Sequence, residues 1–459
     1  MIGQILQPEI KDLIDKRDFT SLKEVLIDWP PADIAEVIED LPNYEQAILF
    51  RILPKDLATD TFEYLDVDTQ IDVLKAMGNE EVTSILNDMS PDDRTALLEE
   101  LPAPIMKQLL MLLSPEERHV AQSLLGYNEN SVGRLMTPDY IAVKENWTVQ
   151  QVLDFIRRHG KDSETLNIVY VVNEKGVLLN DIKIREFLLA PLDQTINELD
   201  DGSYVSLKVE DDQETAVEMF KKYDRIALPV TDNSGILIGI VTVDDVLDVA
   251  EEEATEDIQK IGGVEALDEP YSTISVLGMI KKRAGWLSLL FVGEMFTASA
   301  MGFFEHEINK AVVLALFVPL IISSGGNSGS QAATLVIRAL SLGEITIRDW
   351  WFIMRREIIS GLILGIILAV IGFFRISLWQ FSEHLYGEYW FVIGLTVSFS
   401  LIGVVMWGTL VGSMFPLLLK KLGFDPATSS APFVATLVDV TGLMIYFYLA
   451  IIFLQGSLL

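Results

Sequence analysis

Residues 431–442 read APFVATLVDVTG and begin an apolar run that continues to residue 454. A run of about 20 apolar residues can cross the hydrocarbon core of a bilayer as a helix. Asp439 lies well inside this run, which contains no Lys or Arg to neutralise it. Because a charge at this depth costs about 3 kcal/mol, we interpret Asp439 as a candidate functional residue. The alternative is a protonated carboxyl group that bonds to a neighbouring helix.

Helical spacing gives this run one distinctive face. Residues three and four positions apart lie on one side of a helix, and here they are small, polar or acidic: Pro432, Ala435, Thr436, Asp439 and Gly442. Such residues suit a packed or water-lined surface better than contact with lipid. We therefore expect this face to line a path for an ion.

Four more apolar runs precede this one. The five predicted spans are residues 285–303, 311–337, 357–379, 389–418 and 432–454. Basic residues gather before the first span, between the second and third, and between the fourth and fifth: Lys281, Lys282, Arg283, Arg338, Arg348, Arg355, Arg356, Lys420 and Lys421. Since basic loops remain in the cytosol, we expect a multi-pass protein of the cytoplasmic (plasma) membrane, with its N-terminus cytosolic and its C-terminus outside.

The second span contains a polar, glycine-dense stretch, SSGGNSGSQAAT, at residues 323–334. Irregular backbone is tolerated at membrane depth only beside a cavity or against protein. We therefore predict a break in this helix, where Asn327 and Gln331 can meet an ion or its water. The alternative is a close-packing face of small residues. Glu294 in the first span is either a second acid of the ion path or a partner in a bond between helices.

Charge is divided very unevenly along the chain. The formal net charge is −33; residues 1–270 hold 57 acidic and 23 basic residues, whereas residues 271–459 hold 10 and 11. Because a strongly negative field repels phosphates, we expect no nucleic-acid partner. The same field attracts divalent cations. The chain has no cysteine, no histidine in the spans and no phosphate-binding P-loop. These absences argue against an enzyme or an ATP-driven pump, and we expect no catalytic residues.

A twelve-residue repeat runs through residues 1–130. At each step a large apolar residue is followed by a helix-breaking one, as in Leu41-Pro42, Leu53-Pro54 and Met89-Ser90. This period predicts an all-α, solenoid-like N-terminal domain of short stacked helices. Ser90 and Ser114 are the expected N-caps of two of these helices.

Two similar halves follow, at residues 131–199 and 200–246, with short β-rich runs and amphipathic helices. Their order, and the stretch GIVTVDDVL at 239–247, resemble a tandem pair of CBS domains. That resemblance implies an α/β fold and a site for an adenine nucleotide at Thr242 and Asp245. The alternative, weighted equally, is that Thr242 only caps the following helix.

The first half departs from this nucleotide pattern. Lys183 and Glu186 stand at the positions of the Thr and the Asp, so we do not expect two equivalent nucleotide sites. An acid-rich connector helix at residues 247–270 then leads into the predicted membrane domain of five transmembrane helices, residues 271–459.

This order of domains resembles the MgtE family of magnesium channels and transporters over essentially the whole chain. Three stretches carry the resemblance: Gly325-Gly326-Asn327 with Gly329 and Gln331, then Glu253 to Asp257, and Pro432 to Gly442. The resemblance implies a homodimer in the lipid bilayer. It also implies that Asp439 of both subunits binds Mg²⁺ in the pore, together with the backbone carbonyl of Ala435.

The resemblance further implies that cytosolic Mg²⁺ binds between the helical domain, the CBS pair and the connector (plug) helix. The acids at the matching positions are Asp212, Glu214, Asp224, Asp245, Asp248, Glu253, Glu256, Asp257 and Asp425, and in the helical domain we choose Asp88, Asp92 and Asp93. Acidic domains repel one another unless cations lie between them, so Mg²⁺ would favour a compact, closed state.

The expected function is therefore a Mg²⁺-selective channel or carrier that imports magnesium and closes when cytosolic Mg²⁺ is abundant. Mg²⁺ would be both substrate and regulator, with ATP as a candidate ligand of the CBS pair. The alternative is a membrane-anchored CBS-type sensor of nucleotides or cations that transports nothing itself.

Overall fold

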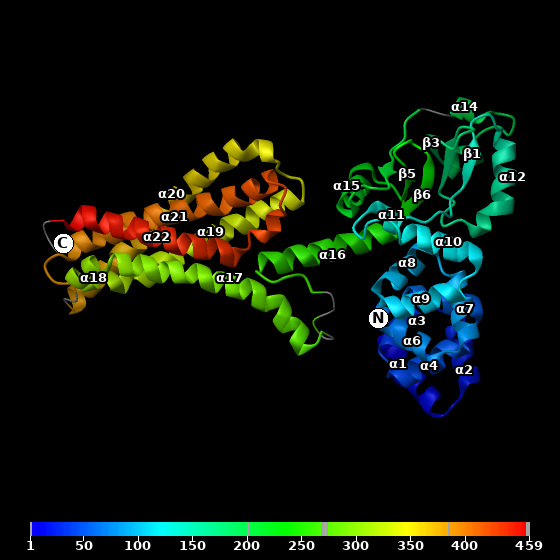
Figure 1. Cartoon of the computed structure of the whole chain (residues 1–459), viewed down its shortest axis with the longest axis horizontal. Coiled ribbons are helices and arrows are strands. Elements are labelled where there is room, and N and C mark those ends of the chain that lie inside the picture. The colour runs from blue at the N-terminus through cyan, green and yellow to red at the C-terminus, as the bar shows by residue number, and fades with distance from the viewer. Residues whose placement is uncertain (1, 200–201, 268–270, 272–273, 384–385, 456–459) are drawn as a thin grey trace. The chain divides into compact units, whose positions relative to one another are not determined.

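The computed structural model describes residues 2–199, 202–267, 271, 274–383 and 386–455. The chain forms two compact units, residues 1–251 and 252–459. The first unit holds short helices and two small β-sheets, and the second holds the long apolar helices (Figure 1). The predicted order of an all-α domain, an α/β pair, a connector helix and a helical membrane domain is thus confirmed.

Short helices fill the first part of the chain, in step with the twelve-residue repeat. They are α1 (Ile2–Asp15), α2 (Phe19–Leu26), α3 (Pro31–Glu39), α4 (Asn43–Ile52), α5 (Lys55–Glu63), α6 (Val67–Ala76), α7 (Asn79–Asp88), α8 (Pro91–Glu100), α9 (Ala103–Leu112) and α10 (Pro115–Leu124). From α3 onward each breaker lies between two helices, as predicted. The apolar residues four positions before the breakers form the core, and Phe50, Phe62, Leu86 and Leu98 are at most 1% exposed.

Side-chain hydrogen bonds in this stack repeat every two helices rather than every helix. Gln70, Arg94 and Arg118 each donate to the carbonyl eight residues earlier, at 2.8, 3.0 and 2.7 Å. Glu39, Glu63 and Asn87 each accept the backbone N–H 27 residues later, at 2.8, 2.8 and 2.7 Å. The structural unit is therefore a helix pair, a period that the apolar pattern alone does not show.

The two serines expected to cap helices behave differently. Ser114 accepts the backbone N–H of Glu117 at 3.2 Å and caps α10 as predicted. Ser90 occupies the N-cap position of α8, but its side chain accepts no capping hydrogen bond. Its hydroxyl instead donates to Asp93 at 2.6 Å. The predicted N-cap position of Ser90 is thus confirmed, but its hydroxyl group bonds to a nearby carboxylate, which is a strong acceptor, instead of capping the helix.

Two three-stranded sheets of the same topology follow the stack. Their strands are β1 (Ala142–Lys144), β2 (Ile168–Val172), β3 (Leu178–Lys183), β4 (Leu207–Lys208), β5 (Ala227–Thr231) and β6 (Leu237–Thr242). In each sheet the first two strands are parallel and the last two antiparallel. Isolated bridges pair Val177 with Ile236 and Thr137 with Ile240, so the halves form one body.

Strand β3 lacks the continuous apolar run that would mark it as a strand in the sequence. Asn180 and Asp181 interrupt its apolar pattern, yet they are only 1% and 7% exposed. Arg225 of the second half forms an ion pair with Asp181 at 3.0 Å. A buried acid is tolerated because its partner comes from the other CBS half, and a single strand's pattern does not show that partner.

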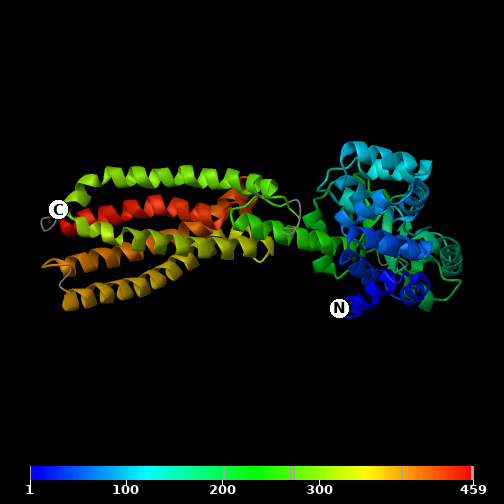
Figure 2. The ribbon, with the colours of Figure 1, turned by 90° about the horizontal axis from the view of Figure 1, so that it is seen from below.

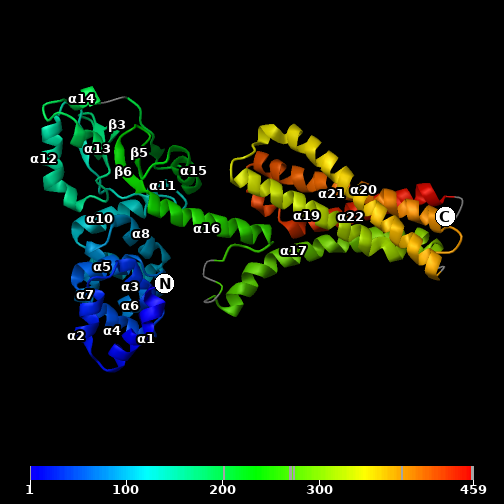
Figure 3. The same ribbon diagram turned by 180° about the vertical axis from the view of Figure 1, so that it is seen from behind.

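Helices surround the two sheets. They are α11 (Val132–Leu135), α12 (Val149–His159), α13 (Ile184–Leu189), α14 (Ile196–Leu199) and α15 (Gln213–Tyr223). Helices α12 and α15 lie at opposite sides of the paired sheets (Figure 3). The connector helix α16 (Val243–Ile261) begins directly after β6 and continues without a break into the second unit.

Among the residues that the structure describes, the second unit has the five expected helices that are long and apolar enough to cross a membrane. They are α17 (Val276–Phe303), α19 (Val318–Ser341), α20 (Trp350–Glu383), α21 (Trp390–Lys421) and α22 (Ala431–Leu454), and a short α18 (Glu305–Lys310) follows α17. Helices α19, α21 and α22 pack closely together. Helix α17 runs along one side of this bundle against α22, and α20 covers α21 on the other side (Figure 2).

The predicted break in the second span is wrong, because α19 is a continuous α-helix through its glycine-dense stretch. Its glycines instead allow close packing on α21. A Cβ added at Gly408 or Gly412 would overlap the backbone carbonyl of Gly325 or Gly329, respectively. The alternative, a close-packing face of small residues, is what the structure has.

Candidate ion path and cytosolic cation sites

Asp439 lies half-buried on α22, facing a glycine of α19. A Cβ added at Gly326 would lie 3.2 Å from Asp439 Oδ1 and 3.3 Å from Ala435 Cβ. The missing side chain at Gly326 therefore allows α22 to approach α19 closely at this point. Asp439 and Ala435, one turn apart on α22, both face Gly326.

The rest of the predicted face meets two other helices. A Cβ at Gly293 of α17 would lie 2.7 Å from Thr436, and a Cβ at Gly442 would lie 2.9 Å from Val404 of α21. Five positions at helical spacing cover about 120° of the circumference, which is wide enough to meet several helices. Gly442 is thus buried against α21 in this chain, rather than beside Asp439.

Polar residues of α19 occupy the side away from α21. Asn327 and Gln331 are both exposed, whereas Gly325 and Gly329 are buried. Asn327 donates to Ser323, one turn earlier, at 3.3 Å. Exposed amide groups in an apolar helix are unfavourable in lipid, so this side of α19 suits water or another protein chain.

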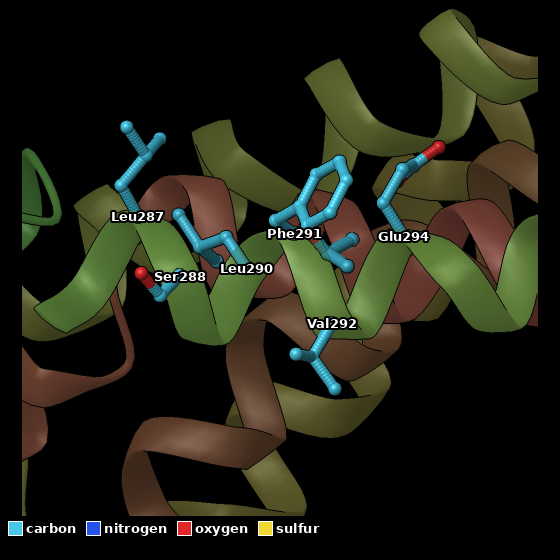
Figure 4. Close-up of a pocket in the computed structure, with 7 residues that line it drawn as sticks. Leu287, Ser288, Leu290, Phe291, Val292 and Glu294 are labelled. Atoms are coloured by element: carbon cyan, nitrogen blue, oxygen red, sulfur yellow. The ribbon is translucent and has the colours of Figure 1, made fainter. Parts of the chain in front are cut away.

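Glu294 lies on α17 at a shallow groove of about 670 Å³ between α17 and α22. Four apolar residues of α17, together with Ser288, Glu294 and Thr436, line this groove. Leu287, Phe291 and Glu294 point to the same side of α17 (Figure 4). The charges of Glu294 and Asp439 interact. No hydrogen bond ties Glu294 to another helix within the part of the chain that the structure describes, so the interhelical-bond interpretation finds no support.

Four predicted regulatory acids form one group in the first unit. Asp92 and Asp93 of α8 face Asp245 and Asp248 at the start of α16. Burial raises the pKa of Asp92 well above its ordinary value, and the charge of Asp245 acts in the same direction. Burial also raises the pKa of Asp245, to about 7, although a hydrogen bond from Thr242 opposes this. The carboxylates therefore repel one another in a partly dry contact.

Sequence reasoning missed three members of this group, Glu63, Glu164 and Asp244, the last of which acts on Asp93, Asp245 and Asp248. Burial raises the pKa of Glu63 to about 7, and the charges of Asp93 and Glu164 add to the effect. Burial likewise raises the pKa of Glu164. Glu63 also holds the backbone N–H of Ser90, so the repeat of the stack offered a signal for it. Glu164 lies in a loop without a recognisable motif.

The remaining acidic candidates of the first unit do not join this group. Asp212 caps the N-terminus of α15 by accepting the N–H of Glu214 at 3.0 Å, whereas Asp224 is the C-cap of the same helix. Twelve residues of helix separate the two ends by about 18 Å, so one ion cannot bridge them. Asp88 pairs with Lys55 at 2.6 Å.

A second group of acids surrounds the end of α16. Lys260 lies 2.6 Å from Glu256 and 2.7 Å from Asp425, in the connection before α22. Burial raises the pKa of Asp257, and the charge of Asp425 acts in the same direction, while Ser341 and Lys260 oppose them. Glu253 lies one turn earlier on α16. The structure thus brings Glu256, Asp257 and Asp425 together.

Both groups offer only oxygen donors, which suits Mg²⁺. Within the described residues, no three Asp, Glu or His side chains are arranged closely enough to hold a metal ion directly. Because Mg²⁺ usually keeps several of its waters and touches one or two carboxylates, widely spaced acids still fit a hydrated ion.

The candidate nucleotide residues form a local contact. The Thr242 hydroxyl donates to Asp245 at 2.6 Å, across the junction of β6 and α16. In the first half, Lys183 and Glu186 are not bonded to each other, and Glu186 lies 3.7 Å from Arg185. The two halves therefore differ at this point, as expected.

Within the described residues, five helices long and apolar enough to cross a membrane follow a helical stack and a paired α/β region, which is the architecture of a multi-pass membrane protein. The family model described as "Divalent cation transporter" matches residues 318–449. The model "MgtE intracellular N domain" matches residues 29–130, and the model "CBS domain" matches twice, at residues 132–193 and 196–252. The magnesium transporter MgtE of Thermus thermophilus is 40% identical over 350 residues, which are 76% of each chain. That of Enterococcus faecalis is 31% identical over 341 residues, 74% of this chain and 73% of that one.

Two solved structures match the first unit. The cytosolic domain of the Mg²⁺ channel MgtE in complex with ATP is 35% identical, with a TM-score of 0.51, over 53% of this chain and 100% of that one. The soluble part of a magnesium transporter is 26% identical, with a TM-score of 0.52, over 55% of this chain and 99% of that one. The chain belongs to the MgtE family.

Proposed function

We propose that this protein carries Mg²⁺ into the cell across the cytoplasmic membrane, through a path at Asp439. The observation that carries the proposal is a half-buried acid inside an apolar helix, whose carboxylate packs against Gly326 of α19. The name of its relatives, magnesium transporter, supports the choice of ion.

The chemistry of the path follows from these donors. The Asp439 carboxylate and the Ala435 carbonyl are hard oxygen ligands, and one carboxylate per chain leaves Mg²⁺ most of its water. A dense cage of acids would bind the ion too tightly to release it. A symmetric homodimer would supply two copies of Asp439, with Pro432, Thr436, Asn327 and Gln331 near the path. Glu294 would serve as a second acid, since its charge already interacts with that of Asp439.

Mg²⁺ uptake into liposomes that contain the purified protein tests this role. We expect Asp439→Ala to abolish uptake, because the path loses its carboxylate. Glu344→Gln, which neutralises an exposed acid in the loop after α19, should leave uptake unchanged. Unchanged uptake with Asp439→Ala would instead support a membrane-anchored sensor without transport.

We further propose that the acidic contact between α8 and α16 responds to cytosolic Mg²⁺. Asp92, Asp93, Asp245 and Asp248 repel one another there, and divalent cations would relieve this repulsion and favour the packed, closed state. Glu253, Glu256, Asp257 and Asp425 would act in the same way at the other end of α16. Limited proteolysis with and without millimolar Mg²⁺ should show slower cleavage with the ion.

Orientation, subunit number and nucleotide binding belong to the same proposal. The N-terminus would be cytosolic and the C-terminus outside, and single cysteines added to this cysteine-free chain would report each side through labelling. Crosslinking in the membrane tests the homodimer.

Because one related cytosolic domain was solved with ATP, we also propose an ATP site at Thr242 and Asp245. Calorimetry with Thr242→Ala tests that site.

A further inference from the structure

The first turns of α17 extend beyond the length that a bilayer core requires. The helix has 28 residues and is therefore about 42 Å long, whereas the hydrocarbon core is about 30 Å thick. All three of its basic residues lie at 281–283, and the rest of the helix up to Phe303 is largely apolar. The excess length thus lies at the start of α17, which is bent away from the axis of the remaining helix (Figure 1).

An apolar stripe runs along these first turns. At 3.6 residues per turn, its members Val276, Leu277, Ile280, Ala284 and Leu287 fall within about 100° of the helix circumference. All five are exposed, and Val276, Leu277 and Ile280 are 76%, 66% and 55% exposed. Side chains of this kind gain free energy when an apolar environment covers them.

Basic residues flank the apolar stripe on both sides. On the helix, Arg283 lies just beyond one edge and Lys281 just beyond the other, and both are exposed. Long basic side chains at such edges can lie along the apolar face and place their charges at the level of lipid headgroups. Residues 276–287 contain three basic residues and no acidic one, whereas α16 contains eight acidic residues and one lysine. The start of α17 is thus a positive segment after a strongly acidic one.

The opposite face of these turns is packed on protein. The indole nitrogen of Trp286 donates to the Ser430 hydroxyl oxygen at 3.1 Å, and the backbone N–H of Glu265 donates to the carbonyl oxygen of Lys282 at 3.3 Å. A Cβ added at Gly263 would lie 2.8 Å from the Trp286 nitrogen. Because these contacts hold one face of the helix, the apolar stripe points away from them.

We propose that the apolar stripe at the start of α17 binds the membrane surface and selects anionic lipids there. Its apolar side chains enter the boundary between headgroups and acyl chains, while Lys281 and Arg283 pair with lipid phosphates. A lipid surface fits this face better than a second copy of the chain, because a symmetric interface on the stripe brings basic residues against basic residues. The inference goes beyond the proposed function and does not depend on transport.

Lipid contacts of the full chain in nanodiscs test the proposal. Because the chain has no cysteine, a fluorophore attached to Ile280→Cys reports on the stripe alone. Its quenching by brominated phosphatidylglycerol and by brominated phosphatidylcholine gives the relative affinity of the site for the two lipids. We expect quenching by both lipids and a preference for phosphatidylglycerol. Adding Lys281→Gln should lower this preference about fivefold, the factor for one basic residue near an anionic surface, and high salt should lower it as well.

Matched variants separate charge from other effects. Lys281→Arg keeps the positive charge and should keep the preference for the anionic lipid. Lys310→Gln removes an exposed lysine at the end of α18, beyond the other end of α17, and should not alter the preference at Ile280→Cys. A fluorophore on Glu24→Cys, at an exposed position of α2, should be quenched by neither lipid.

Three results would overturn the proposal. The first is a fluorophore on Ile280→Cys that neither lipid quenches. The second is an equal affinity for the two lipids, or a preference that Lys281→Gln leaves unchanged. The third is a disulfide between two chains at Ile280→Cys without lipid quenching, which would assign the stripe to a second copy. Unchanged Mg²⁺ uptake with Asp439→Ala would overturn the proposed ion path and leave this lipid contact unaffected.

Discussion

Glu63 offers a quantitative test of the acidic contact between the helical stack and the CBS pair. Its carboxylate is half-buried, holds the backbone N–H of Ser90 at 2.8 Å and feels the charges of Asp93 and Glu164. The change Glu63→Gln removes the charge but keeps an amide oxygen to accept that hydrogen bond. It therefore isolates the electrostatic cost of the contact from its geometry.

The magnitude follows from the pKa of Glu63. Burial, with the neighbouring acids, raises it from the ordinary 4.5 to about 7, and a shift of this size corresponds to about 3 kcal/mol. Between these values the folded unit binds more protons than the unfolded chain, so its stability falls as pH rises through this window. Glu63→Gln should therefore match the wild type near pH 4.5 and be more stable by about 3 kcal/mol at pH 8.

Urea unfolding of a fragment with residues 1–251, at pH 5 and pH 8, measures this difference. Added Mg²⁺ should stabilise the wild type at pH 8 more than it stabilises Glu63→Gln, because one source of repulsion is already gone. Glu24→Gln, at an exposed position of α2, is the control and should show no such pH dependence. A destabilised Glu63→Gln fragment at pH 8 without Mg²⁺ would refute the reasoning.

Two further predictions concern packing. Arg94 is fully buried, donates hydrogen bonds to the carbonyls of Leu86 and Met89, and forms an ion pair with Glu117. Arg94→Met should therefore destabilise the same fragment by about 3 kcal/mol in urea unfolding. An unchanged urea midpoint would show that Arg94 does not stabilise the stack. Gly412→Ala places a Cβ against the carbonyl of Gly329, so it should destabilise the α19–α21 contact by about 2 kcal/mol. We expect a lower melting temperature in detergent and a lower rate of Mg²⁺ uptake. Gly343→Ala, in an exposed turn after α19 with φ +68°, is a control that strains the backbone without touching α21; equal losses in both variants would count against helix packing as the cause.

Periodic patterns in the chain were sufficient to predict its helical stack and its membrane helices. A twelve-residue period indicated the stack, and five long apolar runs indicated the membrane helices. These predictions succeed because helix length and helix breaking are local properties of a segment. The choice of Asp439 as a functional residue also rests on a local property, the cost of a charge in lipid, and it stays a prediction.

Contacts between distant segments were beyond such patterns. Whether the glycines of α19 break the helix or pack it depended on Gly408 and Gly412 of α21, about 80 residues later. Strand β3 was hidden because its Asp181 is neutralised by Arg225. Glu63 and Glu164 join the acidic group, and Lys260 meets Asp425, only through folding. A side chain's charge and burial depend on its neighbours in space, and only the tertiary structure brings those neighbours together.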